Sequence, residues 1–155
     1  MKFFSTFDVA ASGMSAQRKQ MDLISMNIAN VNTTETADGS PFRRMVAVVS
    51  QKQVGDWNDE FRAVSFDDEK AGTATGVEVS SVQQDQSDFR WVYDPSNPKA
   101  QQEGAHKGYV AMPNVNIIAE MTNMIQATRA FEANATVVES AKSMAMKALD
   151  IGKGH

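Results

Sequence analysis

Apolar side chains recur every three or four residues near the start of the chain. The recurring positions are Phe7, Ala10, Met14, Gln17, Met21, Ile24 and Ile28, and all of them except Gln17 are apolar. This alternating spacing is typical of a helix with one narrow apolar seam. We predict a helix from about Ser5 to Asn30. Ser5 and Asp8 have the spacing of a capping box, and polar residues from Asn30 to Thr34 favour an end there.

The end of the chain repeats this spacing over a longer stretch. Its positions are Ile117, Met121, Met124, Thr128, Phe131, Ala135, Val138, Lys142, Ala145 and Leu149. Pro113 and Asn114 precede them, and asparagine is a favoured N-cap residue. We predict a second helix over residues 115–151, about 55 Å long at about 1.5 Å per residue.

The middle of the chain has a different pattern. All four prolines, both tryptophans and both tyrosines lie between residues 41 and 113, whereas eight of the ten methionines lie outside that window. Proline, glycine and aromatic residues favour strands and turns. The β-branched and aromatic runs predict four strands, at Phe42–Gln53, Phe61–Phe66, Gly76–Val82 and Phe89–Tyr93.

These elements indicate an α+β fold. Long N- and C-terminal helices pack as a coiled-coil-like stem, and a small β-rich insertion lies between them in the sequence. The expected segments are residues 1–34 for the N-terminal helix, 35–112 for the insertion and 113–155 for the C-terminal helix. A seam this narrow normally meets another helix. The two helices therefore pair within one chain or across several chains.

Composition excludes several classes of protein. A chain of 155 residues with 42% hydrophobic residues suits one folded domain. Its net charge of −4 argues against electrostatic binding of nucleic acid. It contains no cysteine, which excludes disulfides, cysteine-ligated metals and thiol catalysis. Ser5, Thr6 and Asp8 interrupt the first apolar residues, so we expect no cleaved signal peptide and a chain that is soluble when made.

The motifs of catalytic and cofactor sites are missing from the sequence. His106 is flanked by Glu103 and Lys107 and has no obvious catalytic partner, so we interpret it as a loop residue. Asp56, Asn58 and Glu60 alternate as in a calcium loop, but Phe61 stands where that loop requires glycine. We expect no enzyme, no cofactor, no metal and no small-molecule substrate.

Two groups of motifs carry a family resemblance. Residues 11–18 and 21–34, which include Asn-Ile-Ala-Asn-Val-Asn-Thr at 27–33, resemble the N-terminal motif of bacterial flagellar rod, hook and hook-associated axial proteins. Tyr93-Asp94-Pro95, Gly108–Asn116, Glu120–Ile125 and Arg129–Asn134 resemble the short proximal rod members of that family. Residues 51–88 contain no motif of this kind.

The resemblance implies a structural subunit of the proximal rod. Such subunits polymerise helically into the drive shaft that transmits torque from the motor to the hook in the basal body. Its partners would be other copies of the chain, neighbouring proximal and distal rod subunits, and the adaptor at the rod base or export gate. The chain would reach the periplasmic rod through the flagellar export apparatus, without a cleaved signal peptide.

The seams and the motifs together predict residues that pack between subunits. These are Phe7, Ala10, Met14, Gln17, Met21, Ile24, Asn27, Ile28, Asn30, Ile117, Met121, Met124, Ile125, Phe131, Asn134, Ala135, Val138 and Leu149. Two alternatives stay open at this point. One is another flagellar axial component, and the other is a cytoplasmic helical adaptor or export chaperone.

Overall fold

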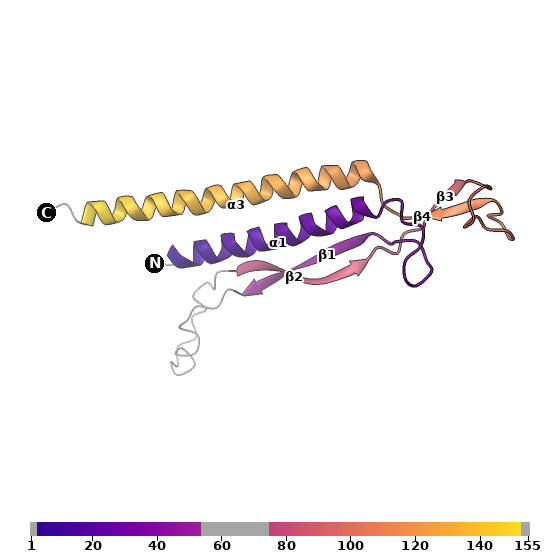
Figure 1. Cartoon of the computed structure of the whole chain (residues 1–155). Helices are drawn as coiled ribbons and strands as arrows, with labels where there is room; N and C mark the ends of the chain where they lie inside the picture. The colour runs from indigo at the N-terminus through magenta and orange to yellow at the C-terminus, as the bar shows by residue number, and fades with distance from the viewer. Residues whose placement is uncertain (1–2, 54–74, 153–155) are drawn as a thin grey trace, which may run out of the picture. The chain divides into compact units, whose positions relative to one another are not determined.

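In the part of the chain that the structure describes, a long helix lies near each end of the sequence and four strands lie between them (Figure 1). A computed structural model describes residues 3–53 and 75–152. The elements in chain order are α1 (Phe3–Ala29), β1 (Met45–Gln53), β2 (Thr75–Gln84), β3 (Arg90–Tyr93), β4 (Tyr109–Met112) and α3 (Ile117–Gly152). The prediction of an α+β fold with long terminal helices and a β-rich middle is confirmed. The strand expected at Phe61–Phe66 lies outside the described residues.

The strands form two separate two-stranded sheets. β1 is paired with β2, and β3 is paired with β4. The second pair is antiparallel, with Arg90 opposite Met112 and Tyr93 opposite Tyr109. Contacts divide the chain into two compact units that each contain parts of both helices. The first unit contains residues 1–19, 49–80 and 127–155, and the second contains residues 20–48 and 81–126. The division into three consecutive segments stays a prediction.

In the first unit, α1 and α3 approach each other through small residues. Ala10, Ala16, Ala127 and Ala141 are buried there. A Cβ atom added to Gly13 would lie only 2.8 Å from Nδ2 of Asn134 on α3. β2 also joins this unit, because the backbone N–H of Val77 donates a hydrogen bond of 3.1 Å to Oγ of Ser12. The small side chains therefore set how closely the two helices approach.

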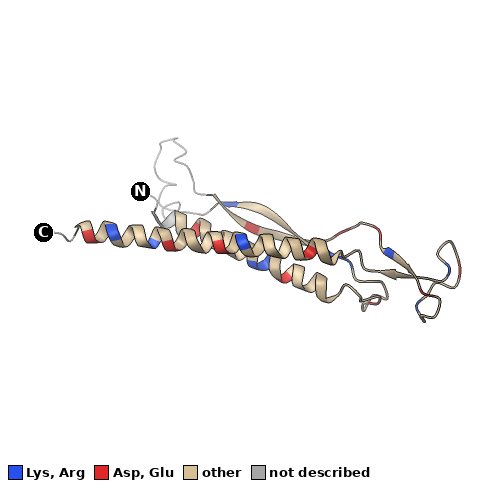
Figure 2. Cartoon of the chain, turned by 90° about the horizontal axis from the view of Figure 1, so that it is seen from above, with Lys and Arg blue, Asp and Glu red and all other residues tan. Residues whose placement is uncertain are grey.

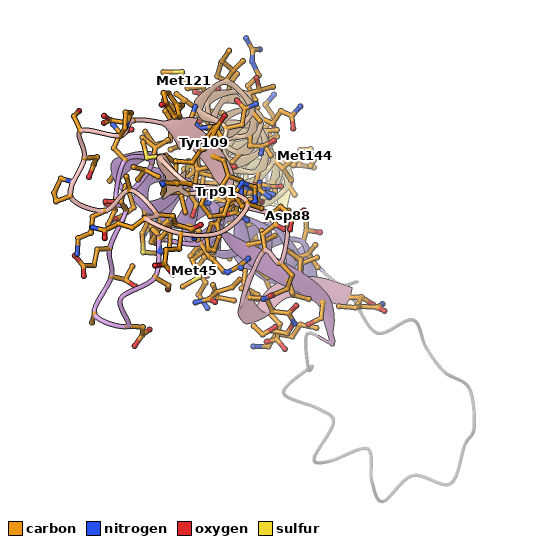
Figure 3. The ribbon with its side chains drawn as sticks, turned by 90° about the vertical axis from the view of Figure 1, so that its right-hand side faces the viewer. Met45, Asp88, Trp91, Tyr109, Met121 and Met144 are labelled. Atoms are coloured by element: carbon orange, nitrogen blue, oxygen red, sulfur yellow. The ribbon has the colours of Figure 1, made fainter. Side chains whose placement is uncertain are left out.

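In the second unit, the buried apolar residues come from α1, from β4 and from the segment between β4 and α3. Ile24, Val110 and Val115 are buried there, together with Pro113. Side chains of β3 and β4 form ring contacts: Tyr93 meets Tyr109 edge to face, with 5.1 Å between ring centroids. Trp91 stacks on His106 at 4.2 Å, so the loop that contains His106 is tied to β3. Figure 3 shows Trp91 and Tyr109 close together in this unit.

The boundaries of the helices differ from the prediction at their N-terminal ends. α1 begins at Phe3, so Ser5 lies within the helix instead of preceding it. α3 begins at Ile117, and Asn116 is its N-cap, because its Oδ1 accepts hydrogen bonds from the N–H groups of residues 118 and 119 at 3.0 and 3.3 Å. The prediction of Asn114 as N-cap is wrong. Its side chain instead bonds to residues far away in the sequence.

Candidate assembly surface

A buried carboxylate joins α1 to α3 in the second unit. The side chain of Glu120 on α3 is only 1% exposed. Its Oε2 accepts a hydrogen bond of 3.0 Å from Nδ2 of Asn27 on α1, which is also 1% exposed. The Asn27 amide also bonds to both backbone groups of Met45 on β1, at 2.8 and 2.9 Å. Asn27 therefore ties α1, β1 and α3 together.

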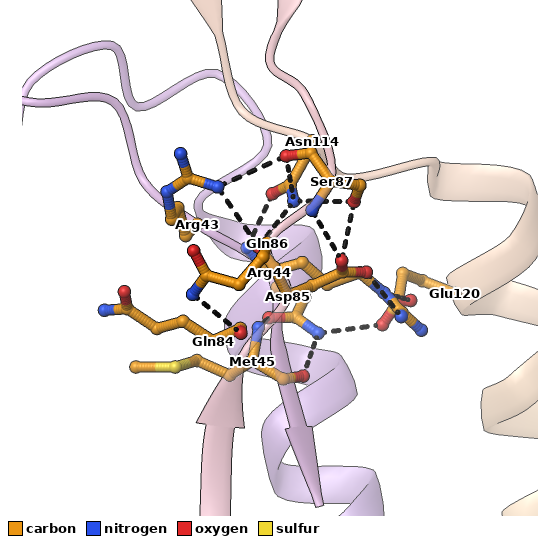
Figure 4. Close-up of polar contacts among 10 residues, drawn as sticks. Arg43, Arg44, Met45, Gln84, Asp85, Gln86, Ser87, Asn114 and Glu120 are labelled. Carbon is orange, nitrogen blue, oxygen red and sulfur yellow. Dashed lines mark hydrogen bonds and ion pairs between the residues drawn. The ribbon is translucent and has the colours of Figure 1, made fainter.

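Arg44 supplies the positive charge that a buried carboxylate requires. Its Nε donates a hydrogen bond of 2.7 Å to Oε1 of Glu120, and its Nη1 lies 3.4 Å from Oδ2 of Asp85 (Figure 4). Burial alone would lower the pKa of Arg44, but the two carboxylates outweigh that effect and raise the pKa above its usual value. Arg44 is therefore a permanent cation between two acids.

Asn114 and Ser87 complete this polar cluster. The Asn114 side chain accepts the backbone N–H of Arg44 at 2.8 Å and donates to the backbone oxygens of Asp85 and Ser87. Ser87 donates hydrogen bonds from its hydroxyl group and its backbone N–H to Oδ1 of Asp85. These two bonds, with a smaller effect of Arg44, hold the pKa of Asp85 below its usual value. We call Asn27, Arg44, Asp85, Asn114 and Glu120 the polar latch.

The residues of the polar latch form hydrogen bonds and ion pairs with one another and with nearby backbone groups. The polar latch therefore has a structural role. In the part of the chain that the structure describes, every buried side-chain nitrogen and oxygen atom has a hydrogen-bond partner. Within residues 3–53 and 75–152, no three histidine, aspartate or glutamate side chains are arranged to hold a metal ion. No described helix is long and apolar enough to span a bilayer.

The start of α3 presents large apolar side chains to solvent. Ile118 is 78% exposed, Met121 56% and Ile125 58%. These positions recur at a spacing of three and four residues, so they lie on one side of the helix, and we call them the outer face. Met121 lies on the side of α3 opposite β1 and β2 (Figure 3). The outer face contains no charge (Figure 2). Glu120 is the only charged residue between 117 and 126, and its side chain is buried.

The predicted subunit-packing residues divide into three groups by their burial within the chain. Ala10, Ile24 and Asn27 are buried. The half-buried residues are Phe7, Met14, Gln17, Met21, Ile28, Asn30, Met124, Phe131, Asn134 and Val138. The exposed residues are Ile117, Met121, Ile125, Ala135 and Leu149. The α1 positions thus face the chain's own core, whereas several α3 positions do not. Whether these residues pack between subunits stays a prediction.

Among the buried residues of the two helices, sequence reasoning missed four. They are Ala16 on α1 and Glu120, Ala127 and Ala141 on α3. Each α3 position lies a multiple of seven residues from the next, with Asn134 in the same series. The available signal for these buried α3 positions was a seven-residue repeat of small or polar residues. The large apolar residues beside this repeat gave the stronger periodicity, so the prediction followed them.

Comparison with known proteins gives matches at both ends of the chain and over its full length. Residues 7–35 match the family described as Flagella basal body rod protein, and residues 106–151 match the family described as Flagellar basal body rod FlgEFG protein C-terminal. The flagellar basal-body rod protein FlgC of Borreliella burgdorferi is 43% identical over 155 residues. Those of Bacillus subtilis and Salmonella typhimurium are 38% and 36% identical. Each alignment covers 99% of this chain and all of the relative.

Proposed function

The chain belongs to the FlgC family of flagellar basal-body rod proteins, and we propose that it polymerises through the outer face of α3. It is a structural subunit of the proximal rod of the flagellar basal body. In our proposal its copies and neighbouring rod subunits form a helical shaft that transmits torque from the motor to the hook. A catalytic role is not part of this proposal.

The outer face is the observation that carries the proposal. A contiguous apolar patch of this kind marks an interaction site on most soluble proteins. Full burial of one isoleucine or methionine side chain contributes about 1.5–3 kcal/mol. Burial of Ile118, Met121 and Ile125 by a neighbouring subunit would therefore contribute several kcal/mol of binding free energy, which the isolated chain does not gain.

The core that each chain builds for itself supports the same conclusion. Four of the seven buried hydrophobic residues in the described part of the chain are alanines, which bury little apolar area. A subunit that completes its core by contact with neighbours is expected to have this composition. Contacts between two different surfaces of the same subunit generate open helical assemblies, as a rod requires.

We place the subunit in the periplasmic part of the basal body and propose that it arrives through the flagellar export apparatus. The proposed partners are other copies, neighbouring rod proteins, and the adaptor at the rod base or export gate. Recovery of the tagged chain in purified basal bodies would separate this role from that of a cytoplasmic adaptor or chaperone.

Ile125→Asp tests the outer face directly. The residue is 58% exposed, so the substitution leaves the fold of the chain intact but places a carboxylate in the proposed contact. We expect no rods and no motility when this variant replaces the normal chain. Ile125→Leu is the matched control and should assemble normally. Circular dichroism should give the same helix content for both variants, and normal rods with Ile125→Asp would refute the proposal.

A further inference from the structure

An open groove lies beside the start of α3 in the second unit. Its volume is about 330 Å³. The residues that line it are Val31, Asn32, Arg90, Val115, Asn116, Ile117 and Ile118. All four apolar ones are β-branched. Ile118 is 78% exposed and also belongs to the outer face, so the groove and the outer face are continuous at this residue. The groove is therefore lined mostly by apolar side chains, and Arg90 is its one cationic side chain.

Two charged residues around the start of β3 form no ion pair in the described part of the chain, and one of them, Arg90, lines the groove. Arg90 is exposed and forms no ion pair with any residue of 3–53 or 75–152. Asp88, two residues earlier and also exposed, is likewise unpaired among those residues. A segment that binds in the groove should therefore present apolar side chains beside an acidic residue, with a basic residue nearby.

The last turns of α3 present that combination. Met146 is 57% exposed and Leu149 is 65% exposed. Asp150 follows directly, so the three residues have the spacing of one helix face. Lys147 is the nearby base, three residues before Asp150. The charge of Asp150 is thus opposite to that of Arg90 in the groove. Lys147 has the charge opposite to that of Asp88, two residues before Arg90 in the sequence.

We propose that the end of α3 of a second copy of this chain docks in the groove, through Met146, Leu149 and Asp150. The two surfaces belong to different copies, because α3 is one helix. Leu149 lies about 46 Å along it from Ile118 at about 1.5 Å per residue. The contact joins two different surfaces, so it repeats from copy to copy without closing. This inference rests on the proposed function, to which it adds the partner surface and its orientation.

Disulfide trapping tests the docking, since the chain contains no cysteine of its own. Full-length chains with Ile118→Cys are mixed with full-length chains with Leu149→Cys and oxidised. We expect a dimer of the two different chains. A chain with both substitutions should give a ladder of multimers on a non-reducing gel. Ser140→Cys replaces Leu149→Cys as the matched control, because Ser140 is also exposed on α3 but lies outside the proposed contact.

Charge exchange provides the second measurement. Arg90→Asp and Asp150→Arg should each reduce the yield of trapped dimer by about two- to fivefold, as expected for one exposed charge pair. The combination of both substitutions should restore it. Trapping at Ser140→Cys equal to that at Leu149→Cys would overturn the docking. So would a trapped partner that is a different rod protein.

The failure of this inference and the failure of the proposed function give different results. If no dimer forms while Ile125→Asp still prevents rod assembly, the docking is wrong and the outer face remains the assembly surface. If Ile125→Asp leaves rods normal, the proposed function itself is wrong, whatever the trapping experiment gives.

Discussion

The ion pair between Arg44 and Glu120 allows a prediction about which partner is more costly to lose. The Glu120 side chain is 1% exposed, whereas the Arg44 side chain is 26% exposed and retains Asp85 at 3.4 Å. Arg44→Met leaves a buried carboxylate with one neutral partner, Asn27. Glu120→Met leaves a cation that still reaches water and a second acid. We therefore expect Arg44→Met to be the more destabilising substitution.

The magnitudes follow from burial. Removal of one partner of a buried ion pair costs about 3–5 kcal/mol, and we expect Arg44→Met to lower the free energy of unfolding by about 4 kcal/mol. Glu120→Met should cost about 2 kcal/mol, because solvent screens the charge that is left behind. The double variant places two methionines in contact and buries no charge. It should cost less than Arg44→Met alone, since apolar replacement of a buried pair is often close to neutral.

Urea unfolding of the isolated full-length chain measures these differences. Circular dichroism and tryptophan fluorescence should give coincident transitions if the two-state treatment holds. The exposed pair Lys52 and Glu78, 3.3 Å apart with side chains 57% and 47% exposed, is the matched control. Methionine at either of these positions should change the free energy of unfolding by less than about 1 kcal/mol. Equal losses for Arg44→Met and Glu120→Met, or a double variant that loses their sum, would refute the reasoning.

Three further predictions concern local contacts. Asn116→Ala should lower the free energy of unfolding by about 1 kcal/mol, measured by urea unfolding, because it removes the cap of α3, whereas Asn116→Asp should keep the cap. Gly13→Ala alone would bring the new methyl group against the Asn134 amide, so we expect no gain in stability. Together with Asn134→Ala, which removes that amide, it should raise the free energy of unfolding by up to about 1 kcal/mol. Thermal unfolding of the single and double variants tests this. Ser87→Ala should raise the pKa of Asp85 toward 3.8, followed by NMR titration of the carboxyl group. Because the folded pKa lies below that value, the stability that Asp85 contributes is present above pH 3.8 and is lost as the pH falls through the folded pKa, so Ser87→Ala should reduce this loss.

The helices were predictable because their signal is local. The apolar spacing from Phe7 to Ile28 depends only on neighbours along the chain, and α1 extends over all of it. The same holds for β1, β2 and β3, which the β-branched and aromatic runs marked to within a few residues. β4 was missed, since its four residues, Tyr109–Met112, become a strand only by pairing with β3.

The polar latch could not be predicted from the sequence. Its bonds join residues separated by up to 93 positions, and no local pattern records such distances. Asn114 was predicted as a helix cap, and the charge of Arg44 was not assigned to any contact. Both side chains instead satisfy groups that meet only in the folded second unit. Burial of a charged pair depends on which elements come together, so it follows the tertiary structure and not the sequence around it.

The arrangement of side chains on α3 explains why the seam was ambiguous. The buried positions in the described part of α3 are Glu120, Ala127 and Ala141, whereas Ile118 and Ile125 point to solvent. In a chain that completes its own core, the largest apolar side chains should be inside, because burial of a side chain contributes in proportion to its apolar area. α3 has the reverse order. The small residues allow α1 to approach, and in our proposal the large residues form a second contact, with neighbouring subunits. Periodicity detects both stripes but does not say which of them the chain itself covers, and the proposed assembly would account for the stripe that is left uncovered.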